Sequence, residues 1–151
     1  MTNSIEQTLI DTAMTPTQLS LNKLRSEGYL VAVVERWTDV EHQSLFGFAD
    51  LLAIKGDTVV AVRAVSYGND SSARKTISQN QDAATWFNPP RREIVVHEWI
   101  QRRSSNGSKT WHCHEVAIMF PGAFWPDKYR PLGHPDIPPD TTTEIKDLCP
   151  E

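Results

Sequence analysis

Cysteines, long apolar runs and glycine-rich loops are scarce or missing in this sequence. The 151 residues contain two cysteines, Cys113 and Cys149, too few for a disulfide framework and compatible with a reducing compartment. No apolar run approaches the roughly 20 residues that cross a bilayer. The glycines stand singly, which leaves nucleoside triphosphate binding without support, and the acidic N-terminus does not resemble a secretory signal. These absences predict a cytoplasmic protein that does not span a membrane.

Basic residues are also too few for a surface coated with positive charge, because the formal net charge is −4. They are unevenly placed, however. Between Arg63 and Thr110, eight basic residues stand against four acidic ones, whereas from Pro126 onward six acids stand against three bases. This asymmetry is typical of a local phosphate-binding face with an acidic tail. The alternative is scattered, solvated charge without a ligand.

Proline is concentrated at one end of the chain and divides it. Seven of the ten prolines lie between Pro121 and Pro150, where they exclude a regular helix or a central strand. The sequence therefore predicts a leader over residues 1–14 and one folded domain over residues 15–120. Residues 121–151 are expected to form an extended tail that packs on the domain or on a protein partner.

The first regular elements have clear boundary signals. Thr15, Pro16 and Gln18 form a capping-box pattern with proline at the first helical position, which predicts a helix from Pro16 to about Glu27. Gly28 is a suitable stop. The β-branched run 29–34 predicts a buried strand, and residues 37–44 look like a polar connection.

The following stretch predicts a hairpin, a helix and two more strands. Strands are expected at 45–54 and 59–65, joined by a tight turn, and a second helix is expected from about Ser72 to Phe87. Further strands are predicted at 93–100 and 109–119. The expected class is α/β (α+β), with an αβββαβ core in which helices flank a mixed sheet.

Asp50 is the residue in this pattern that most needs an explanation. It is a carboxylate within an apolar strand, where burial costs several kcal/mol unless the group is paired, protonated or bound to a metal. One interpretation is a buried ion pair with Arg63 that holds two strands in register. The other is a functional site.

Four segments carry a family resemblance. They are LNKLRSEGYLVAVVERW at 21–37, LFGFADLLAI at 45–54, VVAVRAVSYGN at 59–69 and VVHEWIQRR at 95–103. Together with the αβββαβ order, these segments resemble the PD-(D/E)xK nuclease superfamily, which has the restriction-endonuclease-like fold. The resemblance is to the small Holliday-junction-resolvase-like or phage-type branch of that superfamily. The resemblance spans about residues 15–118.

The resemblance implies a magnesium site whose strand aspartate corresponds to Asp50. An E-x-K or Q-x-T-like tripeptide of that family falls on Arg63, Ala64 and Val65, so this chain departs from the pattern. Mg2+ prefers oxygen ligands, and an arginine beside one carboxylate can replace the charge of the metal. Loss of catalysis is one consequence of this departure.

Other residues could complete an active site. The hypothesis places Mg2+ on Asp50 with Glu35 or Glu41, makes Asp50 and Glu35 catalytic, and assigns Lys75 to the attacking water. The basic residues expected to hold DNA phosphates are Arg63, Arg74, Lys75, Arg91 and Arg92.

Two functions therefore remain open. An active protein would be a Mg2+-dependent endodeoxyribonuclease acting on DNA. The alternative is a catalytically inactive structural or protein-interaction module of a phage or mobile element. By analogy with resolvases a homodimer is conceivable, and a phage origin would place the protein in the host cytoplasm or the virion.

His112, Cys113 and His114 invite a zinc interpretation. Strand alternation sends the two histidines to one face and the cysteine to the other, so the three cannot share one ion without distortion. A zinc site that recruits His134 or Cys149 matches no familiar spacing. The five tryptophans could stack on unpaired bases, although such rings more often pack in a core.

Overall fold

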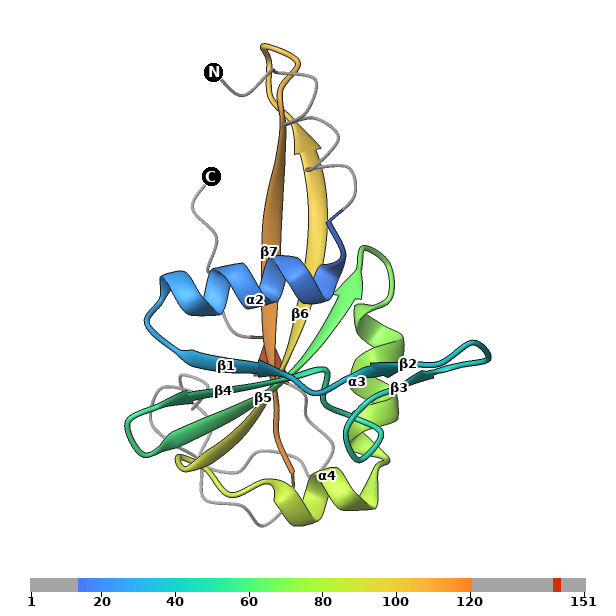
Figure 1. Cartoon of the computed structure of the whole chain (residues 1–151), viewed down its shortest axis with the longest axis vertical. Coiled ribbons are helices and arrows are strands. Elements are labelled where there is room, and N and C mark those ends of the chain that lie inside the picture. The colour runs from blue at the N-terminus through green and yellow to red at the C-terminus, as the bar shows by residue number, and fades with distance from the viewer. Residues whose placement is uncertain (1–13, 121–142, 145–151) are drawn as a thin grey trace.

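The computed structural model describes residues 14–120 and 143–144, which form an α+β domain (Figure 1). In chain order the elements are α2 (Pro16–Ser26), β1 (Leu30–Val33), β2 (Arg36–Trp37), β3 (His42–Gln43), β4 (Leu51–Lys55), β5 (Thr58–Ser66), α3 (Asp70–Ser78), α4 (Gln81–Trp86), β6 (Arg92–Arg103), β7 (Lys109–Ile118) and β8 (Thr143–Glu144). The predicted class and the αβββαβ order of the core are confirmed.

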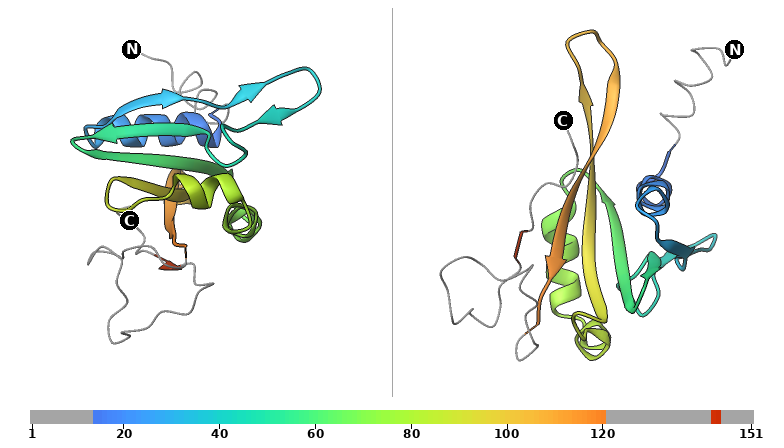
Figure 2. Two further views of the ribbon diagram at one scale, coloured as in Figure 1. Left: turned by 90° about the horizontal axis from the view of Figure 1, so that it is seen from below. Right: turned by 90° about the vertical axis from the view of Figure 1, so that its left-hand side faces the viewer.

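A mixed sheet with the strand order β1-β4-β5-β6-β7-β8 forms the centre of the domain. Strands β1, β4 and β5 are antiparallel, β6 runs parallel to β5, and β7 returns antiparallel to β6. The parallel pair needs a long crossover, which α3 and α4 supply. Helix α2 covers one face of the sheet, and α3 and α4 cover the other (Figure 2).

The start of α2 has the predicted capping box. The backbone N–H of Gln18 donates to Thr15 Oγ1 at 3.2 Å, and Gln18 Oε1 accepts from the backbone N–H of Thr15 at 3.0 Å. The helix ends at Ser26, and Gly28 follows with a φ of +89°, which glycine adopts without strain.

We expect Thr15→Ala to lower the free energy of unfolding by about 1 kcal/mol, since an orphan amide of the first turn loses its acceptor. Urea denaturation measures this change. Thr85→Ala is the matched control, because Thr85 is exposed inside α4 and its hydroxyl donates to the Gln81 carbonyl and caps no helix start. Equal effects of both substitutions would contradict a stabilising cap.

The chain between β1 and β4 differs from the prediction. Instead of a polar connection, residues 36–43 form a two-stranded hairpin in which Trp37 pairs with His42. Strand β4 starts at Leu51, not at residue 45, because the chain first turns through Phe46 and Gly47, both with positive φ. Asp50 therefore immediately precedes the strand.

The second predicted helix, residues 72–87, is two helices in the structure. Asn80 lies between them in an extended conformation, and its Oδ1 accepts from the backbone N–H of Ala83, which starts α4. Its Nδ2 donates to the carbonyl of Phe46 at 3.1 Å. A short amide side chain thus competes with the helical backbone and ties the helix junction to the turn before β4.

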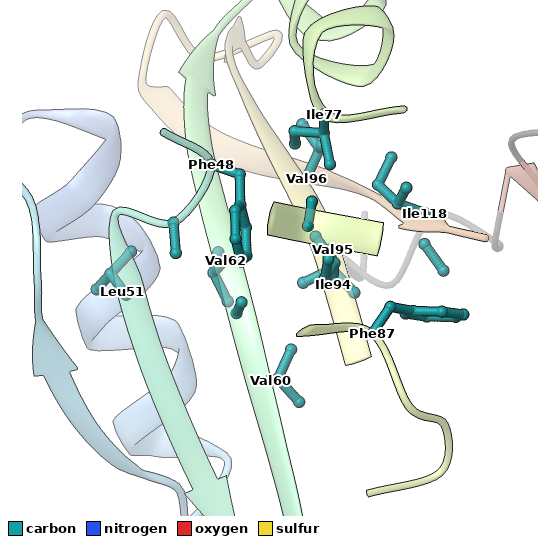
Figure 3. Packing of buried hydrophobic residues seen from close by; sticks show 14 of the residues in the cluster. Phe48, Leu51, Val60, Val62, Ile77, Phe87, Ile94, Val95, Val96 and Ile118 are labelled. Carbon is teal, nitrogen blue, oxygen red and sulfur yellow. The ribbon is translucent and has the colours of Figure 1, made fainter. Parts of the chain in front are cut away.

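The main core lies around the centre of the sheet. Ile77 of α3 packs near Val96 and Ile118, and Phe87 lies beyond the end of α4 (Figure 3). A second cluster under α2 contains Leu19, Trp99 and Cys113. Both clusters bury apolar side chains that the strand and helix patterns place inward.

The predicted leader, apart from Met14, and the Pro-rich tail, apart from β8, lie outside the described residues. Strand β8 pairs with β7 through Thr143 and Glu144 and is the last strand in the order. Among the described residues, no helix has the length and apolar character needed to cross a membrane.

Candidate metal and phosphate site

Asp50 is held in the sheet by its backbone. Its N–H donates to the carbonyl of Val62 on β5, and its carbonyl accepts from the N–H of Val34 after β1, both at 2.8 Å. The side chain is buried, with 1% of its surface exposed. Neighbours on both sides therefore fix the direction of the carboxylate.

The carboxylate of Asp50 has polar partners on both oxygens. Oδ1 accepts from Ser44 Oγ at 2.7 Å and from Arg63 Nη1 at 3.0 Å, and Oδ2 accepts from the backbone N–H of Ala64 at 3.0 Å. Arg63 Nη1 also donates to Ser44 Oγ. The predicted pairing with Arg63 is present, and it offsets the desolvation of the acid.

Glu35 and His42 lie on another side of the same carboxylate. His42 Nε2 is 2.6 Å from Glu35 Oε2 and 3.5 Å from Asp50 Oδ1. One ligand atom from each of the three residues falls within 4.8 Å of the other two, and no second group of this kind occurs in the described part of the chain. The β2–β3 hairpin creates this group by folding His42 back over the end of β1.

A cavity of about 570 Å3 opens beside the group. Glu35, His42 and Arg63 line it, whereas Asp50 lies behind them. The remaining wall comes mainly from the start of α2, the end of β5 and one side of α3, and it mixes apolar with polar side chains. It includes Thr15, Thr17, Ser66, Asn69, Ser72 and Thr76.

Trp37 also lines the cavity and has an exposed ring. Its exposed fraction is 71%, and the ring lies against His42, with ring centroids 4.4 Å apart and planes at 37°. Most tryptophans bury far more of their surface. The hairpin thus presents one aromatic face at the edge of the cavity.

The remaining predicted metal and catalytic residues lie away from the group. Glu41 has an exposed side chain that accepts from Gln43 Nε2 at 2.6 Å, and it is not among the clustered ligands. Lys75 is exposed on α3 and does not line the cavity. The structure therefore brings together Asp50, Glu35 and Arg63, but neither Glu41 nor Lys75.

The other predicted DNA-binding arginines do not line the cavity with Arg63. Arg74 pairs with Asp70 at 3.0 Å within the first turns of α3. Arg91 and Arg92 lie where β6 begins, beside Val59 at the start of β5, whereas Arg63 lies in the second half of that strand. Arg92 Nε donates to the carbonyl of Trp86.

His42 and Ser44 were not predicted as site residues. The stretch 37–44 carries no strong strand pattern, so nothing in the sequence indicates that His42 folds against Glu35. The single signal is a histidine two residues before a serine in a segment that leads directly into Asp50.

Ser20, His97 and Glu115 form a second constellation that sequence reasoning missed. Ser20 Oγ is 3.0 Å from His97 Nδ1, and His97 Nε2 is 3.3 Å from Glu115 Oε2. These residue types occur in hydrolytic triads, but Ser20 and His97 are both fully buried between α2 and the sheet. A nucleophile must be reachable by its substrate, so this group is structural.

The histidines of β7 alternate as predicted. In the register of β7 with β6, His112 lies opposite Ile100 and His114 lies opposite Glu98. Cys113 is buried in the cluster under α2. Within the described residues these side chains belong to no cluster of metal-ligating groups. His134 and Cys149 lie outside the described residues.

No family model, curated protein or solved structure matches this chain.

Proposed function

We propose that this protein is a DNA-directed member of the PD-(D/E)xK fold whose site hydrolyses, or is descended from a site that hydrolyses, phosphodiester bonds. The observation that carries the proposal is the convergence of Asp50, Glu35 and His42 at the edge of a cavity lined by Arg63. The αβββαβ core with a parallel β5–β6 pair supports it. The host cytoplasm or a virion would be its setting.

Each residue has a chemical task under this proposal. Glu35, His42 and Asp50 would hold a divalent ion, which supplies Lewis-acid activation of the phosphate and of water. Arg63 uses one nitrogen on Asp50 and Ser44, so further guanidinium N–H groups remain to face a phosphate in the cavity. Trp37 offers its exposed ring to a base.

Mg2+, the ion that the family resemblance implies, fits this donor set poorly. Mg2+ favours oxygen ligands and retains several waters. Here one of three donors is an imidazole nitrogen, and Arg63 already neutralises part of the charge of Asp50. Glu35, His42 and Asp50 therefore do not form a site suited to Mg2+.

A non-catalytic DNA- or protein-binding module is the second candidate, and the Asp50–Arg63 ion pair favours it. The pair satisfies the buried acid without any ion. Arg63 stands where the family has an acid or amide, so the same fold could persist as a binding scaffold.

We expect wild-type protein to cleave branched, single-stranded or duplex DNA when supplied with a suitable divalent cation, and Asp50→Asn to lose about 100-fold or more of that rate. Cleavage is measured with labelled substrates in the presence of Mg2+, Mn2+ or Zn2+. Asp57→Asn is the matched control, because Asp57 is exposed in the β4–β5 turn.

Binding separates the two candidates when no substrate is cut. Salt-dependent DNA binding that Arg63→Ala weakens would support the non-catalytic module, with a slope of log affinity against log salt that becomes shallower. Absence of DNA binding under all conditions would contradict both DNA-directed functions.

A further inference from the structure

Glu35, His42 and Asp50 together offer one nitrogen and two carboxylate donors, and this mixture selects among metals. We propose that these three residues form a binding site for a transition-metal dication such as Mn2+ or Zn2+ and that the site discriminates against Mg2+. The inference rests on the proposed function for its biological role, but metal binding itself can be measured without DNA.

The distances are close to those of an assembled site. Ligand atoms bonded to one ion at about 2.0–2.2 Å lie roughly 3–3.5 Å apart. His42 Nε2 already lies 3.5 Å from Asp50 Oδ1 and 2.6 Å from Glu35 Oε2, and all three ligand atoms fall within 4.8 Å. Small side-chain rotations are enough to centre an ion.

The three ligands come from positions that the fold holds in place. Backbone hydrogen bonds join Glu35 and Asp50, since the N–H of Glu35 donates to the Asp50 carbonyl at 3.1 Å. His42 is fixed by its pairing with Trp37 and by ring contact with that residue. Rigid placement of ligands lowers the ordering cost of binding.

An ion can reach the site from the cavity. Glu35 and His42 line the cavity, and their side chains are 10% and 23% exposed. Asp50 lies behind them and supplies the buried charge. This order, with accessible donors in front and a fixed carboxylate behind, gives the ion an entry path.

The donor types determine the choice of metal. Imidazole suits Fe2+, Zn2+ and similar ions, and carboxylates suit Mn2+, whereas Mg2+ requires near-octahedral oxygen coordination. Two carboxylates supply two negative charges, and Arg63, 3.0 Å from Asp50 Oδ1, removes about one of them. Reduced charge weakens a hard ion such as Mg2+ most, because its binding depends most on electrostatic attraction.

The existing contacts could be satisfied without a metal. The hydrogen bond between Glu35 and His42 gives these two residues a partner each, and the ion pair with Arg63 gives one to Asp50. The two halves meet at His42 Nε2, which lies 2.6 Å from Glu35 Oε2 and 3.5 Å from Asp50 Oδ1 and so faces both carboxylates. A shared ion accounts for that convergence.

Titration of the full-length wild-type protein with Mn2+, without DNA, tests the proposal. We expect one Mn2+ per chain by calorimetry or electron paramagnetic resonance, bound at least tenfold more tightly than Mg2+. His42→Ala should weaken Mn2+ binding by about tenfold or more. Glu41→Gln is the matched control, because it removes an exposed carboxylate from the same hairpin and should leave Mn2+ affinity unchanged.

Arg63→Gln supplies a test in the opposite direction. It removes a positive charge beside Asp50 and retains a hydrogen-bond donor, so Mn2+ affinity should rise several-fold. Equal affinities for Mg2+ and Mn2+, or His42→Ala that binds Mn2+ like wild type, would overturn the proposal. Folding of each variant is checked by circular dichroism.

The outcomes distinguish this inference from the proposed function. Mn2+ binding that depends on His42, without any DNA binding or cleavage, would support the metal site and contradict the DNA-directed function. DNA cleavage with Mg2+ by a protein that does not bind Mn2+ through His42 would do the reverse.

Discussion

Asp50→Ala is expected to lower the free energy of unfolding by about 3 kcal/mol. The substitution leaves the guanidinium of Arg63 and the backbone N–H of Ala64 without the carboxylate that they now contact. Arg63 is 27% exposed and can turn partly toward water, which limits the loss, whereas the amide of Ala64 is fixed in β5. Urea denaturation at neutral pH measures the change.

Two variants check the origin of this loss. Asp57→Ala removes an exposed acid from the neighbouring turn and should change stability by less than about 0.5 kcal/mol. The double variant Asp50→Ala/Arg63→Ala should be more stable than the sum of the two single effects implies, because both partners are then absent. Additive effects would show that the pair does not stabilise the fold.

Ser20→Ala is expected to cost about 2–4 kcal/mol, although it removes a single oxygen atom. Trp99 Nε1 donates to Ser20 Oγ at 2.8 Å, and the same oxygen lies 3.0 Å from His97 Nδ1. All three residues are buried, so two ring nitrogens would lose their partner where water cannot replace it. Thermal and urea unfolding measure the effect.

Ser26→Ala is the control for Ser20→Ala on the same helix. Ser26 is exposed at the end of α2, and its hydroxyl donates to the carbonyl of Lys23 three residues earlier. Its loss should change stability by no more than about 0.5 kcal/mol. A similarly small effect of Ser20→Ala would mean that a water molecule or a rearrangement satisfies Trp99 and His97.

The sequence predicts a helix or strand well where several local signals, such as a capping box or an apolar run, fall within a few residues. The capping box at Thr15 and the strands β1 and β5 depend on interactions within a few residues, and the structure has them where the sequence indicates. The predicted burial of the first strand is wrong, because β1 lies at the end of the strand order and leaves Leu30 73% and Val33 48% exposed. The helix break at Asn80 combines a local N-cap, in which Oδ1 accepts from the Ala83 N–H, with a bond from Nδ2 to the carbonyl of Phe46, 34 residues earlier in the chain. No local pattern reports such a partner.

The residues of the candidate site also fall into two groups, those that the sequence identifies and those that only the tertiary structure brings to the site. Asp50 was identifiable because an acid within an apolar segment requires compensation, and Arg63 was identifiable as its partner from the expected hairpin. His42 was not, because its role depends on an irregular hairpin that brings it to Glu35 and Asp50. The family resemblance assigns Lys75 to the attacking water, and Arg74 is expected to hold phosphate at the start of the second helix, yet α3 turns other side chains toward the cavity.

The sequence by itself determined the order of helices and strands, the cap of α2 and the need of Asp50 for a partner, because these depend on periodicity and on the cost of burying charge. Only the tertiary structure decided which residues surround Asp50. The neighbours of Asp50 depend on the register of the paired strands and on side chains that approach from distant segments. A shift of one residue in strand register would turn every side chain of that strand to the opposite face and give Asp50 different neighbours.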